Sequence, residues 1–155
     1  MAVSAALERF LTRGRVIGLD TNVFIYQLEA NPKYQASTHH VFKWLAEGKG
    51  RAVTSTITLT ELLVPSYRAK DVEKVNELYA LLSTFPNLTW VPADTVVCDV
   101  AAKVRGEHGL RTPDAIQAAT ALATGATGFI ANDPVFRRIP GMDAMILDDL
   151  IAPEK

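Results

Sequence analysis

Four carboxylates lie where predicted secondary-structure elements meet, in positions that could bring them together. Asp20 directly follows a short apolar run at residues 16–19, and Asp133 follows a second apolar run that ends at Ala131, with Asn132 between them. Glu61 and Asp114 each lie near the start of a predicted helix. Carboxylates gathered within a few ångströms repel one another, and a divalent cation removes that repulsion. The four side chains therefore form a candidate metal-binding and catalytic set.

The residue types of this set favour Mg²⁺ or Mn²⁺ over zinc. Carboxylate oxygens, with water molecules completing an octahedron, suit these hard cations. Neither His nor Cys occurs at the four positions, whereas zinc sites normally contain them. Such a cation can orient a phosphodiester, polarise its phosphorus and lower the pKa of a bound water, so the set indicates phosphodiester hydrolysis. The pattern is compatible with one ion or with two.

Each acid also has a purely structural explanation. Thr58-x-x-Glu61 matches a capping box, and Asp114 follows a Thr-Pro pair typical of a helix start with Thr as the N-cap. Asp20 and Asp133 could cap the segments that follow them. A site is indicated because all four acids lie at junctions between predicted strands and helices.

Polar side chains beside the acids could hold water molecules or a phosphate oxygen. Thr21 and Asn22 directly follow the first acid, and Ser55 ends a predicted strand just before the helix of Glu61. Turn and cap hydrogen bonds would explain these three polar residues equally well.

Strands and helices alternate along the chain. Short apolar runs predict strands, and apolar residues at helical spacing predict helices. Strands that alternate with helices form a mostly parallel sheet covered on both faces, and ligands bind beyond the carboxyl ends of its strands. The predicted strands are residues 16–19, 51–55, 88–91, 126–131 and 145–147, and the predicted helices are residues 34–47, 58–68 (bent or ended by Pro65), 71–83, 94–107 and 112–124, with helical character also after Asn22.

Two of these helices have apolar faces that could contact a partner, residues 34–47 and 71–83. The second has a stripe of apolar residues at helical spacing. The stripe consists of Val72, Val75, Leu78, Leu81 and Leu82.

Length and composition indicate one globular domain. The chain has 155 residues, 48% hydrophobic and 21% charged. Charged residues interrupt the apolar stretch within residues 1–15, so we expect a short helical extension rather than a secretory signal. No uncharged apolar run approaches about 18 residues, so no membrane span is expected. The single Cys98 is expected in the core and indicates a reducing, cytoplasmic setting.

The net charge of −1 is unusual for a protein that binds phosphates. Without the four candidate acids, 13 Asp and Glu face 16 Lys and Arg, a balance of +3. Arg137 and Arg138 follow the last acid closely and are the preferred phosphate contacts. The other candidates are Arg13, Arg15, Lys103, Arg105 and Arg111.

Four motifs occur in order along the chain and together suggest a family. They are LDTNVFIY at residues 19–26, STITLTEL at 55–62, LRTPDAIQAATAL at 110–122 and GFIANDPVFRRIPGM at 128–142. Together they resemble the PIN-domain family of metal-dependent ribonucleases, especially the VapC toxins of toxin–antitoxin pairs. One motif alone would carry little weight, but four in the family's order span nearly the whole chain.

The resemblance implies a fold, an activity and partners. The fold is a three-layer α/β/α sandwich with a mostly parallel five-stranded sheet, in which residues 1–155 form a single PIN-like domain with residues 1–15 as an extension. The activity is Mg²⁺- or Mn²⁺-dependent endonucleolytic cleavage of RNA, and the partners are the RNA substrate, a cognate antitoxin and a second copy in a homodimer. The residues that match the family pocket are Asp20, Glu61, Asp114 and Asp133, with Thr21, Asn22, Thr112 and Asn132 as polar neighbours.

The chain departs from the family pattern in two places. The last motif usually reads Thr-Asn-Asp, but here Ala131 precedes Asn132 and Asp133, so a hydroxyl that helps to position substrate or water is absent. Family toxins also often begin almost at the first strand, which leaves the extension unexplained.

Other classes of function fit less well. A catalytically weak or inactive RNA- or protein-binding module with the same fold is the alternative that Ala131 leaves open. A phosphatase of the aspartyl-phosphate type would have a second Asp where this chain has Asn22, and a phospho-receiver needs an early acidic pair and a late Lys. Neither pattern occurs in the sequence.

Overall fold

A parallel sheet lies at the centre of the computed structural model, which describes residues 3–151. The strand order is β3-β2-β1-β4-β5, and every neighbouring pair is parallel. The predicted fold class, an α/β/α sandwich with a five-stranded parallel sheet, is confirmed. The strands are β1 (Val16–Leu19), β2 (Arg51–Ser55), β3 (Leu88–Val91), β4 (Gly128–Ala131) and β5 (Asp143–Ile146).

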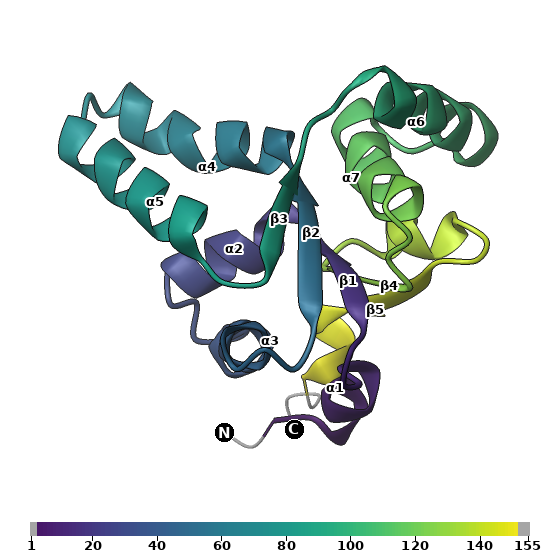
Figure 1. Ribbon diagram of the computed structural model, residues 1–155, viewed down its shortest axis with the longest axis horizontal. Coiled ribbons are helices and arrows are strands. Elements are labelled where there is room, and N and C mark those ends of the chain that lie inside the picture. The colour runs from purple at the N-terminus through teal and green to yellow at the C-terminus, as the bar shows by residue number, and fades with distance from the viewer. Residues whose placement is uncertain (1–2, 152–155) are drawn as a thin grey trace.

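Helices cover both faces of this sheet, and α4 and α5 project together as an arm on one side (Figure 1). The helix that the sequence indicates after Asn22 begins one residue earlier, at Thr21. The α-helices are α1 (Ala5–Phe10), α2 (Thr21–Leu28), α3 (Gln35–Ala46), α4 (Thr56–Arg68), α5 (Val72–Thr84), α6 (Thr95–His108) and α7 (Thr112–Ala123), and the 3₁₀ helices are η1 (Pro134–Arg138) and η2 (Leu147–Leu150).

The central strands β1 and β4 are short apolar runs because both of their faces are buried. Alternate residues of β4 enter different cores: Ile130 packs with helices α1 to α5, whereas Phe129 and Ala131 pack with α6 and α7. On β1, Ile17 and Leu19 belong to the first core. The two cores on opposite faces make the three layers of the sandwich.

Close contact between α7 and the middle of the sheet requires a glycine on β1. A Cβ atom at Gly18 would lie 2.6 Å from Cδ2 of Phe129 and 2.9 Å from the Cβ of Ala121. The inner side of α7 is built from alanines, among them Ala118 and Ala119, which are fully buried. Small residues on both partners therefore let α7 approach the carboxyl edge of the sheet, where its first turn carries Asp114.

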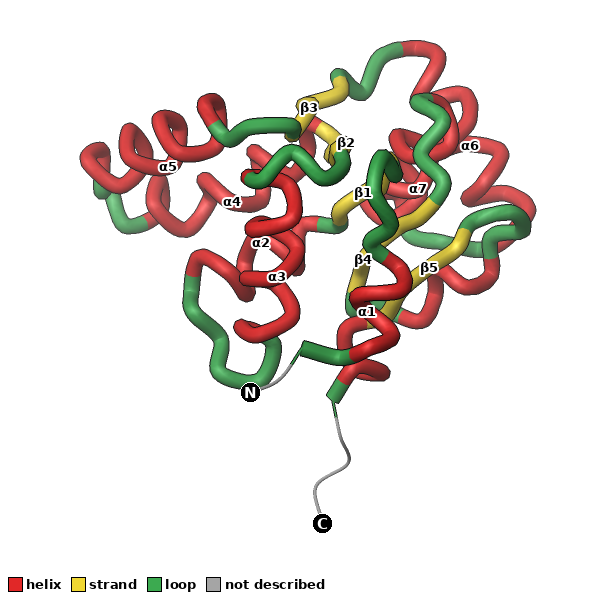
Figure 2. Tube along the Cα trace, turned by 60° about the horizontal axis from the view of Figure 1, so that its bottom comes forward, coloured by secondary structure: helices red, strands yellow, loops and turns green. Residues whose placement is uncertain are grey.

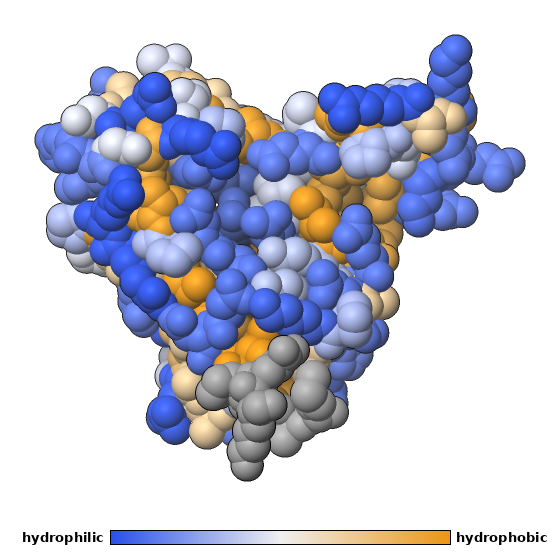
Figure 3. Space-filling model, turned by 180° about the vertical axis from the view of Figure 1, so that it is seen from behind, coloured by the Kyte–Doolittle hydropathy of each residue, from blue (hydrophilic) through white to orange (hydrophobic). Residues whose placement is uncertain are grey.

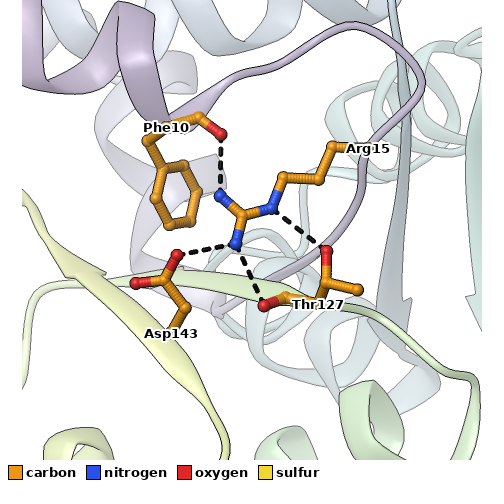
Figure 4. Close-up of polar contacts among 4 residues, drawn as sticks. All are labelled: Phe10, Arg15, Thr127 and Asp143. Carbon is orange, nitrogen blue, oxygen red and sulfur yellow. Dashed lines mark hydrogen bonds and ion pairs between the residues drawn. The ribbon is translucent and has the colours of Figure 1, made fainter.

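The N-terminal helix α1 lies beside β4 and β5, and Arg15 connects it to them (Figures 2 and 4). The Arg15 guanidinium donates to the carbonyls of Phe10 (2.8 Å) and Thr127 (3.0 Å). It also pairs with Asp143 at 2.6 Å and lies over the Phe10 ring. Arg15, a candidate phosphate contact in the sequence, therefore serves the fold instead.

Two helices predicted from the sequence can now be described in more detail. Pro65 does not end α4, one of the two outcomes expected there, and Leu62, Leu63 and Ser66 are buried around it. The predicted helical stripe lies on α5, where Val75, Leu78 and Leu82 are buried and Val72 and Leu81 are exposed. A helix at the edge of the molecule buries only a narrow face, so part of the stripe is left on the surface.

Cys98 is not a core residue, contrary to the sequence prediction. It lies exposed on α6, while its neighbour Val97 points into the second core. The apolar run around Cys98 is part of a helix rather than a buried strand, so only one side of the run faces inward.

We expect Arg15→Met to lower the free energy of unfolding by about 2–3 kcal/mol, because it leaves two carbonyls and a carboxylate without their charged donor. Urea denaturation followed by circular dichroism measures this change. Arg13→Met is the matched control: Arg13 is exposed two residues away and should change stability by no more than about 0.5 kcal/mol. Equal stability of the two variants would contradict the structural role of Arg15.

Candidate active site

Three of the four predicted acids line one pocket at the carboxyl edge of the sheet. Asp20 follows β1, Glu61 lies in the second turn of α4, and Asp114 lies in the first turn of α7. The pocket has a volume of about 380 Å³. Its lining residues are Asp20, Thr21, Asn22, Glu61, Arg111, Pro113, Asp114 and Gln117.

The fourth acid, Asp133, lies beside this pocket rather than in its lining. It follows β4, the strand next to β1, and its carboxylate accepts a hydrogen bond from the Val135 N–H at 2.9 Å. This bond caps η1, so the structural explanation for Asp133 holds. Its charge nevertheless acts on both Asp20 and Asp114, which places it near the group.

Asp20 is the most deeply buried of the acids, with 7% of its surface exposed. Burial raises the pKa of Asp20 to about 7, against the opposing effect of the Thr21 backbone N–H, and the charges of Asp114, Glu61 and Asp133 raise it further. Its own N–H donates to the Ile130 carbonyl, which fixes the backbone in the sheet. The carboxyl group is therefore held at the end of a buried strand, and within residues 3–151 it forms no salt bridge with a Lys, Arg or His side chain.

The other two lining acids respond to the same surroundings. Partial burial raises the pKa of Glu61, although a hydrogen bond from the Thr21 side chain acts in the opposite direction. Burial also raises the pKa of Asp114, while Arg111 lowers it and the charge of Asp133 raises it. The positive charge of Arg111 is thus too small to neutralise the three carboxylates that line the pocket.

Arg111 is the cation at the mouth of the pocket. Its Nε lies 3.5 Å from Oδ2 of Asp114, and the two side chains are 83% and 16% exposed, respectively. A long contact from so exposed a guanidinium is weak. Arg111 can therefore leave Asp114 when another cation or a phosphate competes.

Gln117 is a pocket residue that the sequence analysis missed. It lies one helical turn after Asp114 on α7, and only 2% of it is exposed. Its side-chain amide contacts the hydroxyls of Thr58 and Thr21 and the backbone N–H of Ser55. The i, i+3 spacing from Asp114 was the available signal, because such residues share one face of a helix.

The capping predictions for α4 and α7 were wrong by a few residues. Ser55, not Thr58, is the N-cap of α4, since its Oγ accepts from the Ile57 N–H at 3.2 Å. Arg111, not Thr112, occupies the N-cap position of α7. Thr58 is free of a capping role because its hydroxyl belongs to the buried network around Gln117.

The predicted polar neighbours divide into two groups. Thr21 and Asn22 line the pocket. Ser55 is fully buried under it as a helix cap, and Thr112 faces a separate groove between α6 and α7.

Residues after β4 mostly make contacts within the fold. Asn132 donates to the Tyr26 hydroxyl at 3.1 Å and accepts from the Asp148 N–H at 2.9 Å. Arg137 forms an ion pair with Asp149. Arg138 is exposed near the turn between α6 and α7.

The carboxylate oxygens suit a hard divalent cation, but the side chains do not converge on a single point where such an ion would bind. Within residues 3–151, no group of three or more His, Cys, Asp or Glu side chains stands ready to hold a metal ion. Glu61 is exposed at the pocket mouth and Asp114 is only loosely paired, so both can rotate toward Asp20. Ligation by these acids requires such a rotation.

A second, apolar groove lies between α2 and α5, with a volume of about 280 Å³. Apolar surface is also visible where the arm of α4 and α5 joins the rest of the molecule (Figure 3). Both helices expected to offer an apolar face, α3 and α5, contribute to the groove. Its lining residues are Phe24, Gln27, Leu28, Phe42, Leu81, Leu82, Phe85 and Leu88. Over the described part of the chain, no helix is both long and apolar enough to cross a bilayer.

Comparison with known proteins identifies a family. The model of the PIN domain family matches residues 17–142. No curated protein matches the sequence at a significant level.

Solved structures with this fold include a toxin–antitoxin complex from Klebsiella pneumoniae, with 22% identity and a TM-score of 0.62, over 83% of this chain and 95% of the other. VapBC2 of Rickettsia felis, bound to a DNA fragment from its promoter, matches with 20% identity and a TM-score of 0.67, over 84% of this chain and 98% of the other. VapBC-1 of nontypeable Haemophilus influenzae matches with 24% identity and a TM-score of 0.64, over 86% and 98%. FitAcB of Neisseria gonorrhoeae matches with 22% identity and a TM-score of 0.63, over 87% and 99%. At these identities the likeness establishes the fold.

The raised pKa of Asp20 predicts an unusual dependence of stability on pH. An acid whose pKa is higher in the folded protein than its ordinary 3.8 binds its proton more tightly when folded, so stability falls as pH rises toward the folded value of about 7. Asp20→Asn removes this loss. In EDTA, the free energy of unfolding of Asp20→Asn relative to that of the wild type should increase by about 2–3 kcal/mol between pH 5 and pH 8.

Urea denaturation at the two pH values measures this advantage. Asp99→Asn is the control, because Asp99 is exposed on α6. An advantage for Asp20→Asn that did not change with pH would contradict the raised pKa.

Proposed function

Since the chain belongs to the PIN domain family, we propose that it is a Mg²⁺- or Mn²⁺-dependent endoribonuclease that hydrolyses RNA phosphodiester bonds. We further propose that it is the toxin of a toxin–antitoxin pair, acting in the cytoplasm where its substrate is found. In this proposal residues 1–155 act as a single PIN-like domain, with residues 1–15 as an extension.

One observation carries the proposal: carboxylates from three separate segments converge on one pocket at the carboxyl edge of the sheet. Asp20, Glu61 and Asp114 line that pocket, and their pKa values are all raised. Ionised carboxylates that are at least partly withdrawn from water and lie close together are unfavourable, and a structural role would not require several of them in one place. A bound cation would resolve the conflict.

We assign Asp20, Glu61 and Asp114 as the residues that would hold the metal, with Asp133 beside them as a further ligand if it leaves its cap on η1. When bound, Mg²⁺ or Mn²⁺ supplies a polarised phosphoryl group and a water of lowered pKa. The chain's own contribution is to fix Asp20 at the strand end and to keep Glu61 and Asp114 adjustable. Thr21 and Asn22, which line the pocket, are suited to hold water or a phosphate oxygen.

Phosphate recognition is assigned first to Arg111, because it is exposed at the pocket mouth and only weakly paired. A cation on Asp114 would release the Arg111 guanidinium toward the RNA backbone. Arg138 remains a candidate near the same turn, whereas Arg137 would first have to leave Asp149.

The apolar groove between α2 and α5 is the proposed docking site for an antitoxin helix. A solved structure with the same fold is a toxin–antitoxin complex, which supports a partner of this kind. Leu28 and Leu81 are exposed there, so an amphipathic helix could bury them. We also propose that the toxin forms a homodimer, as family toxins do.

Replacing either adjustable acid should abolish cleavage while the fold persists. Glu61→Gln and Asp114→Asn keep the size of each side chain but remove a charged ligand, so cleavage of a mixed RNA panel in Mn²⁺ should fall by more than about 100-fold. EDTA should have the same effect on the wild type.

Glu73→Gln is the control for these variants, since Glu73 is exposed on α5. Cleavage by Asp114→Asn at the wild-type rate would refute the assignment. Mn²⁺ binding by the wild type without EDTA-sensitive cleavage would instead favour a non-catalytic binding module, the alternative left open by Ala131.

A charge in the apolar groove should prevent antitoxin binding. Leu81→Asp places a carboxylate among the apolar lining residues, so the variant should lose at least about tenfold in affinity for the proposed cognate antitoxin. Val72→Asp is the control, because Val72 is an exposed apolar residue on the same helix outside the groove. Co-purification and calorimetry measure the difference, and equal binding of both variants would exclude the groove.

A further inference from the structure

The buried amide of Gln117 has a role that the acids alone do not explain. We propose that Gln117 is a positioning residue of the pocket, because its amide sets the direction of a hydroxyl network that joins the three segments carrying Asp20, Glu61 and Asp114. The inference rests on the proposed function, since those three carboxylates are the proposed metal ligands.

The orientation of the amide follows from its partners. The Ser55 backbone N–H can only donate, and it lies 3.3 Å from Oε1 of Gln117, so the amide oxygen must be on that side. The amide nitrogen then faces two hydroxyls, with distances of 2.6 Å to Thr58 Oγ1 and 3.2 Å to Thr21 Oγ1. Both amide hydrogens are used, and the reversed orientation would leave Ser55 without an acceptor.

The protons of the Thr54 and Thr58 hydroxyls have one consistent arrangement. Thr54 Oγ1 lies 2.9 Å from the Leu19 carbonyl, which can only accept, so Thr54 donates its single proton there. In the 2.8 Å contact between Thr54 and Thr58, the donor must therefore be Thr58. The Thr21 hydroxyl lies 3.2 Å from Thr58, and its single proton has two acceptors within reach, Thr58 and the Glu61 carboxylate. The network starts at the two N–H groups of Gln117 and ends on the backbone of β1.

The network touches both neighbours of Asp20 but not its carboxylate. It ends on the Leu19 carbonyl and includes the Thr21 hydroxyl, whereas the Asp20 side chain makes no capping hydrogen bond of its own. The position of Asp20 is therefore held through its neighbours. This arrangement leaves the carboxylate oxygens available to a ligand.

The same network reaches the other two acids through helical spacing. Gln117 follows Asp114 by three residues on α7, and Glu61 follows Thr58 by three residues on α4. Residues three apart lie on one face of a helix, so each acid stands next to a network residue of its own helix. Gln117 contacts all three segments, and its removal should loosen the spacing between all three carboxylates.

The test compares Gln117→Met with the control Thr120→Val. Met is similar in length but offers no N–H donor, and Thr120 is a buried polar residue one turn further along α7 whose hydroxyl bonds only to the Ile116 carbonyl of its own helix. We expect Gln117→Met to lower kcat for Mn²⁺-dependent RNA cleavage by about 10–100-fold with little change in KM, as outer-shell residues of metal sites do. Mn²⁺ affinity, measured by calorimetry, should fall in parallel.

A double-mutant cycle with Thr58→Val separates positioning from general stability. If both residues act through one network, the double variant should lose little more kcat than the worse single variant. Should Gln117→Met fail to fold, Gln117→Glu, which keeps the size and the acceptor but lacks the amide donors, serves in its place.

Wild-type values of kcat and Mn²⁺ affinity in Gln117→Met, matching those of Thr120→Val, would overturn the inference. Additive losses in the cycle would also overturn it. A wild-type protein that neither binds Mn²⁺ nor cuts RNA would refute the proposed function itself, which distinguishes that failure from a failure of the role of Gln117.

Discussion

The site depends on one constraint, the burial of the Asp20 carboxylate at the end of an apolar strand. Its backbone is fixed by the bond from its N–H to Ile130 on β4, so the side chain cannot withdraw into water without breaking the sheet. Burial and three neighbouring acids raise its pKa to about 7. The folded chain thus retains an electrostatic conflict that lowers its stability as pH rises from the ordinary pKa of 3.8 to about 7, as expected where stability is traded for function.

The conflict exists only because α7 can approach the sheet closely. Gly18 on β1 and the alanines of α7 place only hydrogen atoms and methyl groups of their own where the helix meets the strand. Asp114 and Gln117 therefore reach the strand end from the other side, and Glu61 arrives on α4. A larger residue at position 18 would push α7 away and separate the acids, even though Gly18 touches none of them.

Helix α2 connects the polar pocket with the apolar groove. Its first residues, Thr21 and Asn22, line the pocket, and Phe24 and Leu28 further along line the groove. Any protein that packs against the groove also contacts the helix that begins at the proposed metal site. The two surfaces differ in chemistry, which suits two different partners, a phosphate-bearing substrate and an apolar helix.

The sequence alone determined the alternation of elements, the parallel sheet and the meeting of Asp20, Glu61 and Asp114, because apolar periodicity and the position of strand ends are local properties that survive folding. It also contained the motifs that resemble the family. Only the tertiary structure decided that Asp133 caps η1, that Arg15 ties α1 to β4 and β5, that Cys98 is exposed, and that Gln117 and Thr58 form a network under the acids. These outcomes depend on which hydrogen-bond partners from distant segments come within about 3 Å. A polar side chain has several possible partners in the sequence, and only the packing of the elements determines which of them it bonds to.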